Sequence, residues 1–449
     1  SMSTNPTLDA AAKKKAKKAR QAAAKAAAAG SLPASVPEPS SSVVAPAPVA
    51  VVQTSTSSVV APPPPPAAAS TTPITPPSFT YGDEPKAPVA QYYLNSSFPH
   101  GQSIDYHQDF NLSRKTSSEM LSRENLNDGI YEQLREAAEA HRRVRQWARK
   151  WIAPGMKMMD IVQKIERGLR VAIGANGLEK GIAFPVGLSR NECAAHYTPN
   201  SGDTTVLGQD DVLKVDLGLH VGGRIIDSAF TLAWNPQFDP LLEAVREATN
   251  AGVKAAGIDV RLCDIGAEIQ EVMESHEVTI GNHTYTVHPI RNLSGHTLGL
   301  YQVHSDKSIP IAKGAGEATK LEEGDLLAIE TFGSTGNGNV QDEADCSHYM
   351  RAFSPAAASS SAIRTGGAKA RELLAFINKN YGTLAFAKRW LDEAGLTRYQ
   401  LALKGMIDAG IVDPYPPLCD VRGAYVAQFE HTVALKPTGK EVFSRGDDY

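Results

Sequence analysis

Two acidic residues interrupt an otherwise apolar stretch, VLKVDLGLHVGGRIIDSAFTLAW (residues 212–234). The Gly-Gly pair between two apolar runs predicts a β-hairpin with a two-residue turn. In that register Asp216 lies opposite Ala229. Asp227, two residues before Ala229 on the same strand, is therefore the diagonal neighbour of Asp216 on the same face, roughly 7–8 Å away. Two ionised carboxylates on a buried face repel each other and lose hydration, so the pair requires a cation, a shared proton or basic partners. The alternative is a solvated polar face on an edge hairpin.

Three further polar residues interrupt apolar, strand-like segments later in the chain: His296 in LSGHTLGLYQVH, Glu330 in LLAIETFG and Glu430 in AQFEHTVAL. With the hairpin they make a set of four carboxylates and one imidazole. Few basic residues lie near these five positions in sequence: Lys214, Arg224, Arg291 and Lys436. Side chains alone are therefore a poor way to neutralise the set, if the strands converge.

A pair of divalent ions is the simplest neutraliser. Oxygen-rich ligation with one histidine suits Mn²⁺, Co²⁺, Fe²⁺ or Zn²⁺ rather than a cysteine-bound structural zinc. Two such ions about 3.5–4 Å apart can share a hydroxide and polarise a carbonyl, which is the chemistry of amide or phosphate-ester hydrolysis. The acidic body of the chain argues against a phosphate-rich polymer as substrate. The residues alone predict a metal-dependent hydrolase, with structural carboxylates as the alternative.

Two more histidines could act beside such a centre. His196 lies in NECAAHYTPN and His304 in YQVH. Either alone is more often a surface or hydrogen-bonded core histidine. Near a metal pair they could instead bind a substrate amine or carbonyl and shuttle protons. No GxSxG or Walker A motif competes with this interpretation, and GSTGNG (residues 333–338) lacks the Lys-Ser/Thr of a P-loop.

The elements that position these residues follow from periodicity. Apolar residues at three-four spacing and helix-ending glycines predict helices at about 127–152, 158–173, 240–256 and 263–277. Strand-like segments follow each pair of helices. The order of helices and then strands thus occurs twice, which suggests two similar halves with a site in the crevice between them. A helical interlude at about 367–409 precedes a last strand, 425–435, that returns to the sheet.

The N-terminal 90 residues differ in composition from the rest. Residues 1–30 hold seven Lys or Arg against one acid, a balance of +6, so the remainder of a chain with net charge −4 carries −10. Residues 31–88 are rich in Pro, Ala, Ser and Thr and cannot bury enough apolar surface to fold. We expect disorder to about residue 90. The basic arm is either a solubilising tail or an electrostatic contact with RNA, for example ribosomal RNA.

Cysteine usage and hydropathy point to an intracellular protein. The four cysteines are widely spaced and form no CxxC, which is typical of reduced thiols. No apolar run reaches the length of a membrane span, and the N-terminus lacks the apolar region of a secretory signal. We therefore expect a cytoplasmic protein without membrane attachment.

Taken together, the motifs resemble those of the eukaryotic type 2 methionine aminopeptidases. The resemblance covers about residues 105–449 and rests on NECAAHYTPN, KVDLGLH, GRIIDSAFT, IRNLSGHTLGLYQVH, AIETFGSTG, DPYPPL, QFEHTVAL and the ending SRGDDY. It implies an α/β (α+β) "pita-bread" fold, in which two pseudo-symmetric halves enclose a dinuclear metal site. It also implies a catalytic domain at 91–449 after the disordered extension 1–90, with a helical insertion at about 348–415.

The resemblance assigns the ligands of two divalent ions (Co, Mn, Fe or Zn). Asp216 would chelate one metal, while Asp227 and Glu430 would bridge both. His296 and Glu330 would complete the coordination of the other metal. All five positions carry the residue that the family pattern requires.

The resemblance also assigns catalytic and substrate-binding residues. Glu330, His196 and His304 would take part in catalysis, and the two histidines would contact the substrate. The pocket for the methionine side chain would be formed by Phe184, Val303, His348, Ala385 and Tyr415.

The implied activity is co-translational removal of the initiator methionine from nascent proteins whose second residue is small. A hydroxide between the metals would attack the scissile carbonyl, and Glu330 would carry its proton to the leaving amine. The implied partners of this monomeric enzyme are nascent N-termini and, through residues 10–30, the ribosome. Two alternatives remain. A related X-Pro peptidase would share the ligands, although HYTPN and the insertion argue against it, and a non-enzymatic ribosome- or RNA-binding protein could keep the fold.

Overall fold

The computed structural model describes residues 79–449 with the exception of 94, 96, 107–109, 315–317 and 354–366. Contacts within the chain divide it into two units, residues 1–71 and 72–449, and every described residue belongs to the second unit. The basic arm at 10–30 lies outside the described residues. Among the helices that are described, none is long and apolar enough to cross a membrane.

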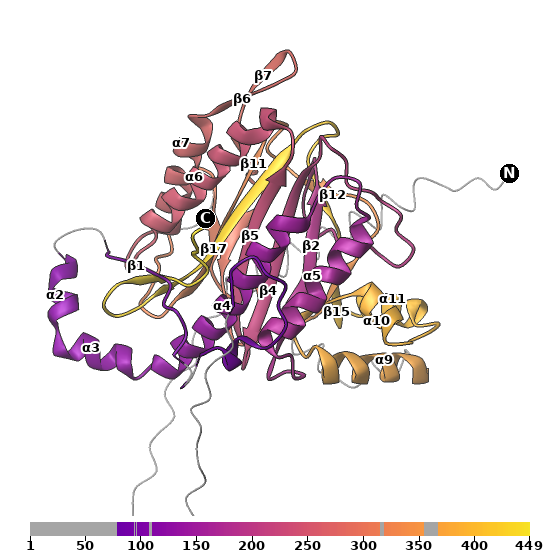
Figure 1. The fold of residues 1–449 in the computed structure, drawn as a ribbon, viewed down its shortest axis with the longest axis horizontal. Coiled ribbons are helices and arrows are strands. Elements are labelled where there is room, and N and C mark those ends of the chain that lie inside the picture. Colours follow the sequence, from indigo (N-terminus) through magenta and orange to yellow (C-terminus); the bar gives the residue numbers. More distant parts are fainter. Residues whose placement is uncertain (1–78, 94, 96, 107–109, 315–317, 354–366) are drawn as a thin grey trace, which may run out of the picture. The chain divides into compact units, whose positions relative to one another are not determined.

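The first half of the described unit is an antiparallel sheet in the order β2-β4-β5. Its strands are β2 (Lys180–Arg190), β4 (Val212–Val221) and β5 (Arg224–Ala233). The glycines of the β4–β5 turn have φ of +55° and +80°, the left-handed conformation that a tight two-residue turn requires. Asp216 pairs with Ala229, so the predicted hairpin register is confirmed. Helices α4 (Asp128–Trp151) and α5 (Met158–Ile173) pack on this sheet (Figure 1).

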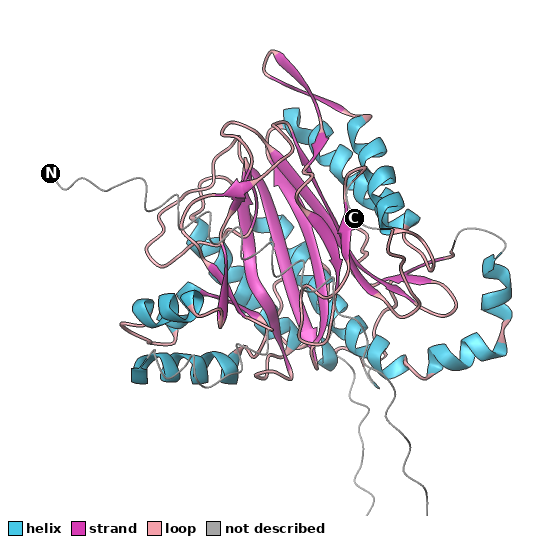
Figure 2. Ribbon diagram, turned by 180° about the vertical axis from the view of Figure 1, so that it is seen from behind, coloured by secondary structure: helices cyan, strands magenta, loops and turns pink. Residues whose placement is uncertain are grey.

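The second half is built around β11 (Leu326–Ser334) and β17 (Val426–Leu435), which pair over their whole length. The described sheet runs β1-β18-β17-β11-β9-β10, and β8 also pairs with β11. Its other strands are β1 (Gln102–Ile104), β8 (His288–Pro289), β9 (Ser294–Thr297), β10 (Ser308–Pro310) and β18 (Lys440–Val442). Helices α6 (Asp239–Ala255) and α7 (Leu262–Glu274) cover it. Figure 2 shows the strands of both halves in the middle and the helices outside.

The segment predicted as an insertion has its own small sheet and its own apolar cluster. The strands β13 (His348–Arg351), β14 (Ala385–Ala387) and β15 (Val412–Tyr415) form a sheet in the order β14-β13-β15. Helices α9 (Gly367–Asn380), α10 (Lys388–Glu393) and α11 (Gln400–Asp408) complete this segment. Its buried residues, among them Phe386, Trp390 and Tyr399, form a cluster separate from the main core.

The remaining described elements are short. They are η1 (Val89–Gln91), α2 (Phe110–Thr116), α3 (Ser118–Asn125), β3 (Cys193–Ala195), η3 (Pro236–Phe238), β6 (Glu277–Ile280), β7 (His283–Thr286), β12 (Gln341–Asp342) and β16 (Leu418–Cys419). The four main helices and β17 start and end within a few residues of their predicted bounds, whereas β18, which follows β17, was not predicted. The repeated order of two helices and then strands is present as well.

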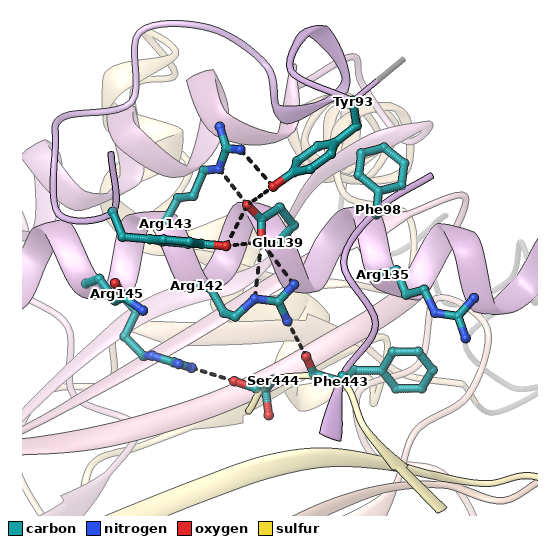
Figure 3. A network of polar contacts seen from close by, with 12 residues as sticks. Tyr93, Phe98, Arg135, Glu139, Arg142, Arg143, Arg145, Phe443 and Ser444 are labelled. Carbon is teal, nitrogen blue, oxygen red and sulfur yellow. Dashed lines mark hydrogen bonds and ion pairs between the residues drawn. The ribbon is translucent and has the colours of Figure 1, made fainter. Parts of the chain in front are cut away.

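Helix α4 carries a buried acid that binds the segment before it (Figure 3). Glu139 is fully buried. Its carboxylate accepts hydrogen bonds from the hydroxyls of Tyr81 and Tyr93, at 2.8 Å each. Arg142 and Arg143 donate to the same carboxylate at 3.0 and 2.7 Å. The charge is thus balanced within the helix, and the two tyrosines attach residues 81–93 to its surface.

Contacts on α4 begin earlier in the chain than the predicted boundary near residue 90. The ring of Phe79 stacks against an arginine of this network, with the guanidinium carbon 3.3 Å from the ring centroid. At the other end of the chain, Arg142 and Arg145 donate to the carbonyl oxygens of Phe443 and Ser444 (Figure 3). Residues 79–90 therefore include packed structure, and the division at 90 remains a prediction based on composition.

Candidate metal centre and substrate pocket

All five polar residues that interrupt apolar strands line one cavity of about 330 Å³. Asp216 on β4 and Asp227 on β5 come from the first sheet, whereas His296 on β9, Glu330 on β11 and Glu430 on β17 come from the second. Asp227, His296 and Glu430 offer ligand atoms that all lie within 4.8 Å of one another. The Nε2 atom of His296 is 3.8 Å from Oδ2 of Asp227 and 3.9 Å from Oε1 of Glu330.

Burial makes this cluster costly. It raises the pKa of Asp216 to about 6. It also raises the pKa values of Asp227, Glu330 and Glu430 well above the ordinary carboxyl range, and the negative charge of neighbouring acids raises these three further. Burial also lowers the pKa of His296 well below its usual value. Since each carboxylate raises the cost of ionising the next, the four cannot all be charged at neutral pH without a cation.

Several oxygens of the cluster have no hydrogen-bond donor. Oδ1 of Asp216, Oδ1 of Asp227 and both carboxylate oxygens of Glu430 are buried and unpartnered within the described part of the chain. Native proteins rarely leave buried polar atoms in this state. A divalent cation accepts electron pairs from such oxygens, and a set of four carboxylates with one imidazole is a suitable donor set for it. The residues present therefore fit a divalent metal centre.

The nearby cations are engaged elsewhere. Lys214 lies on β4 next to the cluster in sequence, but its Nζ donates to the carbonyl oxygens of Asn191 and Val212. Lys307 lines the cavity and was not among the predicted site residues. Its ammonium group pairs with Glu322 at 2.9 Å and with Asp325 at 2.8 Å. Neither lysine neutralises the carboxylate cluster.

Gln428 is a further polar residue of the centre that the predicted site omits. Its Nε2 donates to Oε2 of Glu330 at 3.1 Å and to Oδ2 of Asp216 at 3.4 Å. One amide therefore contacts acids from both halves. The signal was present in the sequence, because Gln428 precedes Glu430 by two residues on the same strand and so points to the same face.

The imidazole wall of the same cavity holds the predicted substrate residues. It includes Phe184, His196, Val303, His304, His348, Ala385 and Tyr415. The ring of His196 meets Tyr415 edge-on, with centroids 5.6 Å apart, and His304 packs edge-on against the proposed ligand His296 at 4.2 Å. The structure thus brings every predicted site residue to one cavity. The role of each remains a proposal.

Local structure explains how this wall forms. Phe184 lies on β2, where the pairing with β4 is irregular. A side chain at the facing Gly218 would stand 2.1 Å from the Phe184 ring, so only glycine leaves room for this ring. His348, Ala385 and Tyr415 lie on the three strands of the small sheet β14-β13-β15. The predicted insertion therefore supplies one side of the pocket.

The imidazoles of this wall are neutral at physiological pH. Burial lowers the pKa of His196 to about 3 and that of His348 to about 4. The pocket walls also lower the pKa of His304 through desolvation. His196 has a φ of +65°, a left-handed conformation that is uncommon outside glycine.

Comparison with known proteins adds the family. Residues 132–369 match the model of metallopeptidase family M24. The chain belongs to this family. The M24 chain is 53% identical to methionine aminopeptidase 2A of Arabidopsis thaliana over 367 residues, which are 82% of each chain. It is 53% identical to methionine aminopeptidase 2 of Schizosaccharomyces pombe over 365 residues, 81% of this chain and 84% of that one.

The solved structures support the same fold. A thermophilic Arx1 aligns with a TM-score of 0.56 at 19% identity and covers 74% of this chain and 92% of its own. At that identity the likeness concerns the fold alone. With the family match and the two helix-and-sheet halves, it confirms the pita-bread fold that the sequence motifs implied. As a member of a metallopeptidase family, the M24 chain is a metal-dependent peptidase.

Proposed function

We propose that this chain is a methionine aminopeptidase that removes the initiator methionine from nascent cytoplasmic proteins whose second residue is small. One observation carries the proposal: a wall of apolar and neutral imidazole side chains directly adjoins the carboxylate cluster within a single cavity. An unbranched apolar side chain such as methionine suits that wall, and the scissile bond would then lie beside the acids. The names of the similar relatives support the same activity.

Asp216, Asp227, His296, Glu330 and Glu430 would hold two divalent ions. Co, Mn, Fe and Zn all suit oxygen-rich ligation with one imidazole. When bound, such a pair supplies a nucleophile at neutral pH and stabilises negative charge on the scissile carbonyl. The unpartnered oxygens of Asp216, Asp227 and Glu430 support this ligand set.

The chain's own residues would handle the protons and the substrate. Glu330 is the proposed proton carrier, because Gln428 engages its Oε2 and leaves Oε1 facing the imidazole of His296. Hydrolysis breaks the C–N bond, adds the water oxygen to the carbonyl carbon and needs one proton at the leaving amine, which Glu330 would deliver. His196 and His304, both uncharged, would hydrogen-bond the substrate carbonyl or amine without repelling a positively charged α-amine.

The basic arm is proposed to dock the enzyme on ribosomal RNA. Its seven basic residues within positions 1–30 support an electrostatic, sequence-independent contact. Replacing these seven residues with glutamine should leave peptide turnover unchanged and weaken ribosome binding in a salt-dependent manner. Such a substitution is preferable to deletion up to residue 88, which would remove the contacts of Tyr81 with α4. Unchanged ribosome binding would refute the docking role.

A peptide assay tests the proposed activity. Metal-loaded protein is offered Met-Ala-Ser and, separately, X-Pro peptides, and free amino acid is measured. Release of methionine from Met-Ala-Ser alone is the expected result. Cleavage of X-Pro peptides alone would identify an X-Pro peptidase, and ribosome binding without any release would favour a non-enzymatic role.

A further inference from the structure

The two halves meet along β5 and β17 without a backbone ladder. The strands lie side by side, yet each belongs to a different sheet. No main-chain hydrogen bond joins the two strands, both of which the structure describes in full. Asp227 lies on one side of this junction and Glu430 on the other. Whatever joins the strands therefore also determines how far apart these two carboxylates are.

Threonine hydroxyls take the place of the missing ladder, in a reciprocal arrangement. Oγ1 of Thr432 on β17 accepts a hydrogen bond from the amide of Asp227 at 2.8 Å and donates to the carbonyl of the same residue at 2.6 Å. Oγ1 of Thr231 on β5 does the same for Gln428, at 2.8 and 2.7 Å. Each hydroxyl thus satisfies both main-chain groups of one residue of the opposite half.

Ser228 adds a third bridge. Its hydroxyl donates to the carbonyl oxygen of Glu430 at 2.6 Å and lies 3.0 Å from the hydroxyl of Tyr449, which can donate to it. Ser228, Thr231 and Thr432 are at most 2% exposed. Bonds of this length in a buried setting are strong, and the main-chain groups that they satisfy have no water to replace them.

We propose that this hydroxyl seam, formed by Ser228, Thr231 and Thr432, sets the separation between the metal ligands that the two halves contribute. The inference rests on the metal centre of the proposed function and adds residues that touch neither metal nor substrate. Since no N–H···O=C bond forms between the strands, they are not held at the roughly 4.8 Å spacing of paired strands. The hydroxyl bonds therefore fix the spacing at Asp227, Gln428 and Glu430. The three are positioning residues.

The test compares two substitutions at one position. Thr432→Val keeps the shape of the side chain and removes both bonds to Asp227, whereas Thr432→Ser keeps the hydroxyl. Mn²⁺ affinity is measured by competition with a chromogenic chelator on metal-depleted protein, and folding is checked by circular dichroism. Thr432→Val should weaken Mn²⁺ binding by about 10–100-fold, the usual effect of losing a group that orients a ligand. Thr432→Ser should remain near wild type.

Thr249→Val is the matched control. Thr249 is also buried (1% exposed), and its hydroxyl donates to the carbonyl of Val245 and lies 3.2 Å from that of Phe429. The control therefore loses a buried hydroxyl that contacts β17 from α6 rather than from β5. It should unfold at a lower temperature and bind Mn²⁺ as well as wild type. A loss of Mn²⁺ affinity that follows from positioning is thereby distinguished from one that follows from lower stability.

The outcomes distinguish this inference from the proposed function. Wild-type protein that binds no Mn²⁺, Co²⁺, Fe²⁺ or Zn²⁺ would overturn the proposed function itself. If the wild type binds Mn²⁺ and Thr432→Val binds it with the same affinity, the hydroxyl seam alone is overturned. The same holds if Thr249→Val loses as much Mn²⁺ affinity as Thr432→Val does. If Thr432→Val does not fold, Thr231→Val repeats the test through Gln428, whose amide contacts two of the acids. Unchanged affinity in that variant overturns the inference.

Discussion

The cavity has two walls of opposite chemistry. The carboxylate wall consists of Asp216, Asp227, Glu330 and Glu430, all on long strands of the two main sheets. The imidazole wall consists of His196, His304 and His348 with the ring of Tyr415, carried by loops and by the small sheet of the predicted insertion. The first wall is rigid because its strands are buried and paired or bridged along their length. The second is assembled from loop residues and from the short strands β13 and β15.

Burial drives both walls toward the uncharged form, with opposite consequences. It raises the pKa of the carboxyl groups, so that remaining ionised requires a cation. It lowers the pKa of the imidazoles, so that they are stable as neutral groups with no added ion. Of the two walls, only the carboxylate wall therefore needs a metal, and the imidazole wall is suited to an apolar side chain.

The largest effect is expected from neutralising one acid of the carboxylate wall. Asp227→Asn or Glu430→Gln should lower turnover below about one-hundredth of wild type, because even groups that only orient a ligand contribute about 10–100-fold. Metal content after dialysis should fall in parallel. Turnover of a Met-Ala-Ser peptide and metal analysis of the same samples check this.

In the metal-free protein the same substitution, Asp227→Asn, should be favourable and should raise the free energy of unfolding. Burial, with the charges of Asp216 and Glu330, raises the pKa of Asp227 well above its ordinary value, so ionising this carboxyl costs more free energy in the folded metal-free protein than in the unfolded chain. An amide carries no such cost, so metal-free Asp227→Asn should have a higher free energy of unfolding than the metal-free wild type in urea titrations at pH 7. A lower value would mean that the acid is held by direct partners, and the case for a cation would be lost.

The next effect is expected on the imidazole wall. His196→Ala should lower turnover by about 10²-fold or more, the usual contribution of a group that hydrogen-bonds or transfers a proton in the reaction. Metal content should stay at the wild-type level, since His196 is not among the proposed ligands. His220→Gln is the control, because His220 is a buried histidine whose Nδ1 accepts a hydrogen bond from the amide of Gly223 and which does not line the cavity. Full activity of the His196 variant would remove it from the site.

Local rules were sufficient to predict part of this comparison. Two-residue alternation and a Gly-Gly turn place Asp216 and Asp227 on one face, and the register confirms it. Three-four spacing likewise predicts α4 and α5 almost to the residue. The imidazole wall could not be derived in this way. His348 and Tyr415 reach the cavity through tertiary contacts of the predicted insertion, and only the family resemblance indicated them.

The junction between the halves was beyond any local rule. Thr231 and Thr432 read as ordinary β-branched strand residues, because nothing in their neighbourhood shows that β5 and β17 meet without a ladder. Gln428 was within reach, since it shares a strand face with Glu430. Its link between Asp216 and Glu330 still depends on β11 pairing with β17 and on β4 lying close to β17. In each case the sequence pattern does not show which strand packs beside the one that carries the residue.

The two walls should also differ in the sign of their pH dependence. Burial, with help from the charge of Arg389, lowers the pKa of His348 to about 4 from an ordinary 6.5. Between these values the unfolded imidazole binds a proton and the folded one does not, so the free energy of unfolding falls as the pH falls. The loss should reach roughly 3 kcal/mol at pH 4. Asp216 has the opposite sign, because a folded pKa of about 6 makes the metal-free protein lose stability as the pH rises toward 6.

Urea unfolding of metal-free wild type and His348→Gln between pH 7 and pH 4 isolates the imidazole contribution. The variant should lack the part of the acid-induced loss that His348 causes, while the contribution of the carboxylate wall is common to both proteins. Identical pH profiles would show that His348 titrates normally and that the imidazole wall is not held neutral by burial.

The smallest effect concerns Ser347, which contacts the ring of His348 and the main chain of His196. The Ser347 hydroxyl is buried, lies 3.1 Å from Nδ1 of His348 and accepts a hydrogen bond from the amide of Thr198 at 3.2 Å. It also lies 3.4 Å from the carbonyl oxygen of His196. A hydroxyl that donates to Nδ1 leaves the proton of His348 on Nε2, which faces the carbonyl of Pro185 at 3.3 Å. Both nitrogens are then engaged, and the ring presents carbon to the pocket.

Ser347→Ala should therefore raise the KM for a methionyl peptide by about tenfold and change kcat and metal affinity less, since a lost hydrogen bond of this kind is worth about 1–3 kcal/mol. The ¹⁵N shifts of the His348 ring give a direct reading, because loss of the donor at Nδ1 removes the preference for the Nε2–H form. Ser201→Ala is the control, as that hydroxyl is exposed and pairs with Asp392 away from the cavity. An unchanged KM together with an unchanged tautomer would show that packing alone holds the imidazole wall in shape. That would sharpen the contrast with the carboxylate wall, whose strands are joined by main-chain and hydroxyl hydrogen bonds.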